Sequence, residues 1–179
     1  AECSHITEIA AGGIHTCACI NTGECGCWGY NAEGQLGIGN NDNILTPVFF
    51  STTEYGSLDA ATYHTCMSRA GGPVSCWGKG NYGELGRGDT NNYNYPIFAA
   101  TGDLASQVAT GEDHSCNLLD TGLVKCWGRN DKGQLGNGAS YTEPVLSPQA
   151  TSSILSDIVQ IDLGKNHSCA LNSNGEVYC

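Results

Sequence analysis

The sequence predicts an all-β protein, a β-propeller-like array of four-stranded antiparallel blades that is repeated three and a half times. One pattern of about 50 residues recurs along the 179-residue chain. Each copy holds short alternating segments between turns rich in glycine, asparagine and aspartate, and no segment has helical periodicity. We therefore expect a single repeat domain over 1–179, divided approximately into 6–57, 58–106, 107–157 and a partial copy, 158–179.

The copies share the order His-[Thr/Ser]-Cys, a turn, Cys-Trp-Gly, and then Gly-[Gln/Glu]-Leu-Gly-x-Gly. Their histidines are His15, His64, His114 and His167, which lie 49, 50 and 53 residues apart. A period of this length is typical of propellers, solenoids and other arrays. The fourth copy reaches Cys179, before the positions of the Trp-Gly pair and the glycine-rich loop.

Four strands are expected in each complete copy. Ile6 and Ile9, or Ile158 and Ile161, indicate the first strand, and the second begins at the histidine. A glycine-containing turn then leads to a third strand that ends in Cys-Trp-Gly, which is typical of a β-hairpin. The fourth strand is indicated by TPVFF, YPIFA and EPVLS, with the proline at its start, where a missing N–H is tolerated.

The hairpin register predicts the cysteine pairing. If each turn is centred midway, cysteines ten residues apart are directly opposed, and Cys19 and Cys25 share the centre of the first hairpin. Opposed residues at non-hydrogen-bonded positions lie within disulfide reach. The predicted pairs are Cys17–Cys27, Cys19–Cys25, Cys66–Cys76, Cys116–Cys126 and Cys169–Cys179. Of the eleven cysteines this leaves Cys3, which suits either a link between chains or a partner outside this sequence.

The same register places each histidine opposite a glycine: His15 opposite Gly29, His64 opposite Gly78 and His114 opposite Gly128. The imidazole is therefore expected to lie across the neighbouring backbone. On the other face, Thr16, Thr65 and Ser115 oppose Trp28, Trp77 and Trp127, as a small hydroxyl residue packs well against a large ring.

Composition excludes some classes of partner. The net charge is −11 with seven Lys and Arg in total, whereas a protein that binds nucleic acid needs a basic face. Anionic membrane surfaces are disfavoured for the same reason, and no apolar stretch approaches the length that spans a bilayer. Eleven cysteines favour an oxidising compartment, so we expect a secreted protein, extracellular or on the cell surface.

At HTCAC, GCWGYNAEGQLGIG and their further copies, the chain resembles the repeats of the regulator of chromosome condensation family over nearly its whole length. The resemblance implies a seven-bladed β-propeller, and the cysteine pairs are similar to those of the disulfide-bearing secreted bacterial members. Family members include a guanine-nucleotide exchange factor for a nuclear GTPase and a secreted β-lactamase inhibitor protein. Seven blades need roughly twice this length. The chain is then a fragment of a longer array, half of a ring completed by another copy, or an open unit that polymerises.

Neither a metal nor a cofactor is expected. His15, Cys17 and Cys27 form a conceivable zinc ligand set, but recurrence in every copy favours a structural role. Nothing distinguishes one copy as catalytic, so we expect no enzyme. The loops GNNDNIL, GDTNNYNY and GNGASYTE lack calcium-loop spacing and differ between copies, so a partner is expected there, with Tyr93, Tyr95 and Tyr141 as binding candidates.

The function expected from these features is that of a non-enzymatic extracellular scaffold or self-assembling, filament-forming subunit. Its partners are other copies of itself, or a protein bound by the variable loops and the incomplete terminal blade. The alternative is a secreted protein-binding propeller module, an inhibitor or receptor-like protein. A GTPase exchange factor is the weaker alternative, because the acidic charge, the cysteine pairs and the missing blades all disfavour it.

Overall fold

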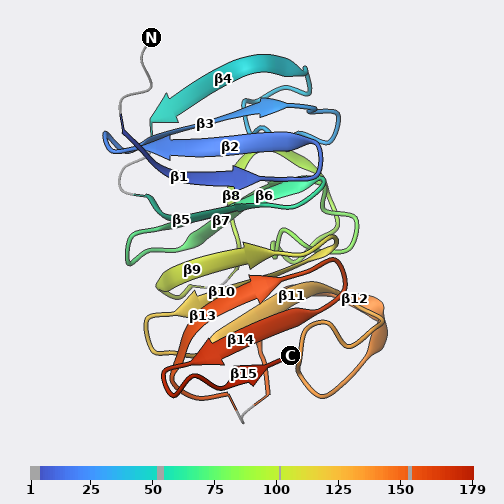
Figure 1. Ribbon diagram of the computed structural model, residues 1–179. Coiled ribbons are helices and arrows are strands. Elements are labelled where there is room, and N and C mark those ends of the chain that lie inside the picture. The colour runs from blue at the N-terminus through green and yellow to red at the C-terminus, as the bar shows by residue number, and fades with distance from the viewer. Residues whose placement is uncertain (1–4, 52–54, 101, 153–154) are drawn as a thin grey trace.

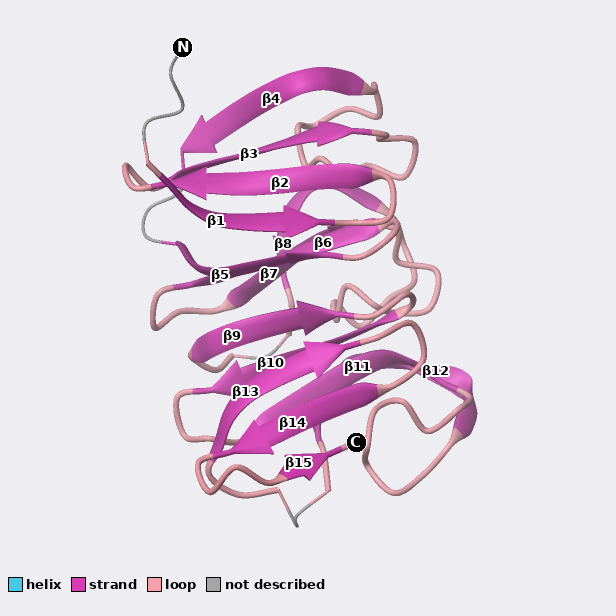
Figure 2. Ribbon diagram, in the orientation of Figure 1, coloured by secondary structure: helices cyan, strands magenta, loops and turns pink. Residues whose placement is uncertain are grey.

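The computed structural model describes residues 5–51, 55–100, 102–152 and 155–179. Its strands form four antiparallel sheets that follow one another along the molecule (Figure 1). No helix occurs within the described ranges, and the connections are loops and turns (Figure 2). This is the all-β, propeller-blade arrangement that the sequence predicts.

Each of the first three sheets has four strands in sequence order, and the fourth sheet has three. The first sheet contains β1 (Ile6–Ala11), β2 (His15–Ile20), β3 (Glu24–Gly29) and β4 (Ile44–Ser51). The second contains β5 (Tyr55–Ala60), β6 (His64–Arg69), β7 (Val74–Gly78) and β8 (Tyr93–Phe98). The third contains β9 (Ala105–Thr110), β10 (His114–Leu119), β11 (Val124–Asn130) and β12 (Tyr141–Ala150). The fourth contains β13 (Ile158–Leu163), β14 (Ser168–Asn172) and β15 (Val177–Tyr178).

The first strands of consecutive sheets lie side by side, so that β5 contacts both β1 and β9, and β9 contacts β13. Side chains of these inner strands bond to the backbone of the next sheet: Glu8 accepts from the Leu58 N–H at 2.9 Å, and Asp59 accepts from the Thr110 N–H at 2.7 Å. The first and fourth sheets lie at opposite ends of the molecule, and the four sheets do not close into a ring (Figure 1).

The predicted hairpin register is confirmed. Each histidine that begins a second strand lies opposite the predicted glycine, and each Thr or Ser that follows lies opposite the predicted tryptophan. The fourth sheet differs at its second strand, because β14 begins at Ser168 and leaves His167 in the preceding loop.

The glycine opposite each histidine is required by the backbone rather than by the imidazole. Gly78 has φ +105°, and a Cβ there would lie 2.4 Å from the Tyr63 carbonyl oxygen. The predicted position of the imidazole, across the opposite strand, is wrong. The His114 ring instead packs over Gly111, three residues earlier in the chain, where a Cβ on the glycine would lie 2.1 Å from Cε1 of His114. From there the imidazole reaches toward the next sheet.

The predicted place of the prolines is also wrong. Pro47, Pro96 and Pro144 lie inside β4, β8 and β12 rather than at their starts. Each falls within an irregularity of strand pairing, for example between the pairs Cys27–Val48 and Gly29–Ile44. These are the outer strands of their sheets, and proline's missing N–H is tolerated at a bulge in such a strand.

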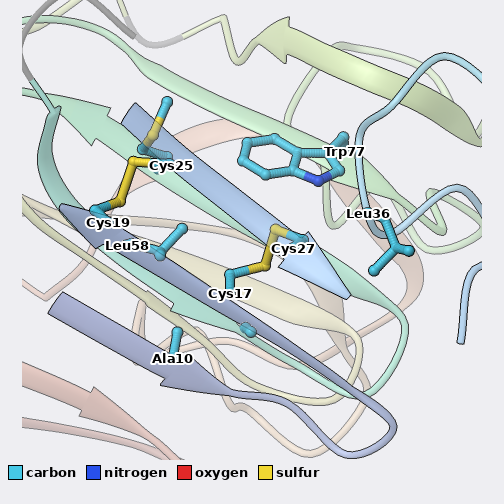
Figure 3. Packing of buried hydrophobic residues seen from close by; sticks show 10 residues of the cluster. Ala10, Cys17, Cys19, Cys25, Cys27, Leu36, Leu58 and Trp77 are labelled. Atoms are coloured by element: carbon cyan, nitrogen blue, oxygen red, sulfur yellow. A yellow bond between two sulfur atoms is a disulfide. The ribbon is translucent and has the colours of Figure 1, made fainter. Parts of the chain in front are cut away.

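The core consists of three clusters, one between each pair of consecutive sheets. In the first cluster, the cysteines of the first sheet pack with Leu36, Leu58 and Trp77 (Figure 3). The second repeats this composition with Leu85 and Trp127. The third contains Leu135 and has no tryptophan among its described members. Each sheet therefore buries its apolar residues against its neighbours rather than within itself.

Cys3 lies outside the described residues, so its predicted role stays a prediction. None of the described segments forms a helix long and apolar enough to cross a membrane.

Candidate protein-binding surface

The histidines join neighbouring sheets. Each Nε2 lies within hydrogen-bonding distance of a hydroxyl oxygen at the start of the second strand of the following sheet. The distances are 2.7 Å for His15–Thr65, 2.9 Å for His64–Ser115 and 3.0 Å for His114–Ser168. The recurring histidines therefore have the same structural role in the first three sheets.

Each of these hydroxyl groups also donates a hydrogen bond to a backbone carbonyl in a loop of the preceding sheet. Ser115 Oγ donates to the Glu84 carbonyl at 2.9 Å, and the Trp127 indole N–H donates to the same oxygen at 2.8 Å. Because the single Ser115 proton is used there, His64 Nε2 must carry the proton that it donates to Ser115 Oγ. Thr65 and Trp77 share the Gln35 carbonyl in the same way, at 2.8 and 2.9 Å.

Burial keeps these imidazoles neutral. It lowers the pKa of His15 and His114 to about 4 and that of His64 to about 3. At His64 the neighbouring histidines and Lys79 lower the pKa further. Protonation of His64 would place a second proton on Nδ1, which is buried without a hydrogen-bond partner, so the charged form would be buried with an unpaired donor.

The structure bonds the sulfur atoms of all five predicted cysteine pairs, with S–S distances between 2.04 and 2.17 Å. Cys17 and Cys27, which with His15 are a conceivable zinc ligand set in the sequence, are joined to each other. Neither therefore holds a thiolate, which is the form that binds zinc.

One copy carries a carboxyl group where the others carry an amide. Glu84 is fully buried at the position of Gln35 and Gln134. Its Oε2 accepts the Tyr82 N–H at 2.7 Å, and the two glutamines accept the equivalent N–H at 3.0 and 2.8 Å. Its Oε1 is buried without a hydrogen-bond partner. Burial raises the pKa of Glu84 to about 7, despite the N–H groups of Glu84 and Tyr82, which lower it.

A second group of residues lies beside Glu84, where the loops of the second and third sheets meet, at positions that hold Ile14, Tyr30 and Glu33 in the first copy. Lys79 Nζ bonds to Asp113 Oδ1 at 2.7 Å, and Arg129 Nη1 lies 3.3 Å from Asp113 Oδ2. Both cations lie over the Tyr82 ring, 5.1 and 5.0 Å from its centroid, and Lys79 also lies 5.7 Å from the Tyr63 centroid. We call these five residues the Tyr82 cluster.

The buried Asp113 carboxylate holds the cluster together, because it accepts hydrogen bonds from both cations. Arg129 also pairs with Asp131 at 2.8 Å. Contacts of a cation with an aromatic ring are worth about 0.5–1 kcal/mol at exposed sites. The cluster is therefore a preorganised aromatic and cationic surface, with half-buried Tyr63 and Tyr82.

The tyrosines predicted as binding residues do not form one site. Tyr93 and Tyr95 make an edge-to-face pair with centroids 6.0 Å apart, but Tyr93 packs against the core and donates to Asp89 Oδ2 at 3.0 Å. Tyr141 is exposed at the start of β12, in another sheet. A binding role for these three residues stays a prediction.

The Tyr82 cluster is not predicted from the repeat pattern, although the sequence contains a signal for it. Lys79 and Arg129 follow Cys-Trp-Gly, where the first copy has Tyr30. Tyr63 and Asp113 precede the histidine, where the first copy has Ile14. Differences between copies at positions outside the loops mark the residues that the repeat does not require.

A model of the regulator of chromosome condensation (RCC1) repeat matches residues 23–66, 72–118 and 121–171, which is most of the chain. The chain belongs to this family. A second model of the same repeat matches residues 105–134. Each of the three matches begins near the third strand of one sheet and ends in the second strand of the next, so the family's repeat is offset from the sheet.

Solved structures of similar fold are considerably longer. Prp20p from Saccharomyces cerevisiae matches with a TM-score of 0.82 and 19% identity over 93% of this chain and 43% of its own. Human WBSCR16 matches with a TM-score of 0.84 and 22% identity, over 96% and 46%. The ectodomain of the Physcomitrella patens receptor kinase CR4 matches with a TM-score of 0.59 and 22% identity, over 97% and 40%. This chain thus spans less than half of each, and identities this low establish the fold alone.

Proposed function

We propose that this chain is a non-enzymatic, protein-binding part of a propeller, with the Tyr82 cluster as its contact surface. The observation that carries the proposal is that these residues, at positions that hold Ile14, Tyr30 and Glu33 in the first copy, gather at one junction between sheets. Tyr and Arg are enriched at protein interfaces, and the Asp113 contacts fix both cations before a partner arrives. Both cations are already paired with Asp113, so we expect the Tyr82 ring to contribute more to the affinity for a partner than the net charge of the cluster does.

A protein as the ligand class is supported by a structural neighbour. Prp20p is described by its binding to Gsp1p and histones. Those partners belong to that protein, and the acidic charge of −11 on this chain disfavours an anionic ligand such as nucleic acid.

The test places a photo-crosslinking phenylalanine derivative at Tyr82 and, as a matched control, at Tyr30, which is exposed at the Lys79 position of the first sheet. The protein crosslinked from the native medium is identified and purified, and its dissociation constant is measured with Tyr82→Ala and Tyr30→Ala. Loss of an interface aromatic at a contact centre is expected to weaken binding at least about tenfold, and the control no more than about twofold. Equal binding by both variants would contradict the proposed surface.

An extracellular location forms part of the proposal. The five bonded cysteine pairs support it, because such pairs persist in oxidising compartments. Mass spectrometry of the native protein after denaturation and alkylation without reduction is expected to find all ten of these cysteines unmodified. Alkylation of Cys66 and Cys76, which are fully buried in the folded state and become accessible on unfolding, would contradict the location.

A second candidate function is head-to-tail self-assembly, as a scaffold or filament, and it rests on the two end faces. Thr16 and Trp28 of the first sheet are half-buried, whereas Thr65 and Trp77 are fully buried against a preceding sheet. His167 of the fourth sheet is exposed at the position that bonds to a following sheet elsewhere. The first face of one copy thus has groups that suit the last face of another.

Light scattering after size exclusion tests this assembly. The wild-type chain is expected to form species whose mass grows with concentration, and Trp28→Ser is expected to reduce them because it removes the ring on the first face. Tyr141→Ser serves as the control at an exposed aromatic residue away from both faces. A wild-type chain that stays monomeric at high concentration would rule this candidate out.

A further inference from the structure

The interface between the second and third sheets brings two polar side chains face to face. Cys66 Sγ of β6 lies 3.7 Å from Ser115 Oγ of β10, so these two residues point toward each other across the interface. Side chains two residues apart along a strand share a face. The next side chains that β6 and β10 turn toward this interface are therefore Ser68 and Asn117. We call Ser68 and Asn117 the polar pair.

A contact of the neighbouring inner strands supports this arrangement. Ser57 is the strand partner of Ser68, and Val108 is the strand partner of Asn117. The Val108 N–H donates to Ser57 Oγ at 3.3 Å, which joins the two sheets beside the polar pair. Both side chains of the pair are fully buried.

The equivalent positions in the other two interfaces are apolar. Counted from the histidine of each sheet, they are Cys19 and Met67 in the first interface and Leu118 and Ala170 in the third. Cys19 and Met67 belong to one core cluster, and so do Leu118 and Ala170, which shows that these positions meet. The second interface has polar residues at both positions, so the change in one sheet is matched by a change in the sheet that faces it.

The polar pair does not satisfy its own hydrogen-bonding groups. Ser68 Oγ, Asn117 Nδ2 and Asn117 Oδ1 are all buried without a hydrogen-bond partner among the described residues. Buried polar groups of native proteins bond almost always to protein atoms or to ordered water. The pair offers a donor, an acceptor and a hydroxyl that can act as either, and neither side chain is charged. Such a set suits a small uncharged molecule that both donates and accepts.

We infer that the interface between the second and third sheets holds an enclosed water molecule, bound by Ser68 and Asn117. Water can accept from Asn117 Nδ2 and donate to Ser68 Oγ, and buried waters make about three hydrogen bonds. Serine and asparagine together are smaller than cysteine with methionine, or leucine with alanine, by more than the roughly 30 Å³ that a water molecule occupies. The water joins the same two sheets as the Lys79–Asp113 ion pair, so it supports the junction that carries the Tyr82 cluster.

A high-resolution crystal structure of the wild-type chain tests the site directly. It is expected to show an ordered water oxygen within about 2.7–3.2 Å of Ser68 Oγ and of an amide atom of Asn117. Absence of electron density for water at this place, whether or not the two side chains bond to each other, would overturn the inference.

A double variant tests the same site in solution. Ser68→Leu with Asn117→Ala copies the Leu118 and Ala170 pair of the third interface, and the adjoining Val74 and Val124 already match. Oxygen-17 relaxation dispersion detects water molecules that stay bound longer than the protein tumbles, and the double variant is expected to lose the contribution of about one such water. An unchanged dispersion in the folded double variant would contradict the site.

Ser75→Ala is the matched control for this measurement. Ser75 is a buried serine of the same sheet, but its strand partner Met67 packs toward the first sheet, so Ser75 faces away from the polar pair. The control is expected to keep the wild-type dispersion. Loss of the same water signal in Ser75→Ala would place the water elsewhere and overturn the assignment to Ser68 and Asn117.

Urea unfolding tests whether the two positions act together. Ser68→Leu and Asn117→Ala are each expected to lower the urea midpoint, because each leaves the other polar side chain buried without its water-mediated contact. The double variant is expected to return to the wild-type midpoint or above it, since an apolar pair replaces both groups at once. A loss in the double variant equal to the sum of the two single losses would show that the positions are independent, and the inference would then be wrong.

Discussion

At the scale of single residues, one hydroxyl group in each sheet connects three groups of the interface. Ser115 Oγ accepts from the His64 Nε2–H and donates to the carbonyl that also receives the Trp127 indole. All of these groups are buried, so each depends on the others for its hydrogen bonds. The small side chain at this position therefore decides whether the histidine of the preceding sheet has an acceptor for its Nε2 proton.

Ser115→Ala is expected to destabilise the fold by about 1–3 kcal/mol, because it leaves the His64 donor buried without an acceptor. The control is Thr16→Ala, at the same position of the first sheet, where Thr16 is half-buried and no described sheet precedes it. That change is expected to cost less than about 0.5 kcal/mol. Urea unfolding measures both variants, and equal losses would show that the hydroxyl acts within its own sheet.

Glu84→Gln is expected to stabilise the protein above pH 7 and to have little effect below about pH 4.5. The pKa of Glu84 is raised to about 7, so the folded state resists losing this proton and is destabilised as pH rises from 4.5 through 7. Each tenfold change in the acid constant corresponds to about 1.4 kcal/mol, so the gain at high pH is on the order of 3 kcal/mol. Urea unfolding at pH 8 and pH 5 tests this, with the exposed Glu24→Gln as the control. A gain that does not depend on pH would contradict the assignment.

At the scale of the element, the hairpin between the second and third strands is the most regular part of the chain. In it, opposed cysteines lie 4.1 Å apart between Cα atoms in the first three sheets. The outer strands are less regular, because their pairing shifts near each proline. The hairpin follows from turn residues close in sequence, whereas the start of an outer strand depends on a bulge formed across the sheet.

Replacing both Cys66 and Cys76 with alanine is expected to lower the free energy of unfolding by about 3 kcal/mol, because the bridge constrains the unfolded hairpin. Replacing both Cys19 and Cys25 is the control. That bridge lies inside the loop already closed by Cys17–Cys27, so its removal is expected to cost less than half as much. Urea unfolding under non-reducing conditions compares the two variants, and equal losses would show that packing outweighs chain entropy.

At the scale of the whole molecule, the sheets stack so that each completes the core of the next. The sequence predicts the sheets, the strand register and the opposed cysteines, because those features repeat and depend on local spacing. It does not predict the Tyr82 cluster, because Lys79 and Asp113 lie in different sheets and meet only when these stack. The predicted direction of the histidine side chains was wrong for the same reason. An alignment of the copies shows which residues share a strand, but it does not show which side chains point toward the next sheet.

Stacking also makes the stability of the whole molecule sensitive to acid. Each of the three interfaces holds one neutral histidine, His15, His64 or His114, with a pKa lowered to between about 3 and 4. The unfolded chain takes up these protons below about pH 6.5, so the histidines' contribution to stability is complete above that pH and is lost as pH falls toward 4. Urea midpoints measured from pH 7 to pH 5 are expected to fall steeply, and His64→Gln is expected to reduce that slope. The control is His167→Gln, at an exposed histidine with no following sheet, which is expected to leave the slope unchanged. If His64→Gln leaves the slope at its wild-type value, the interface histidines do not control acid stability.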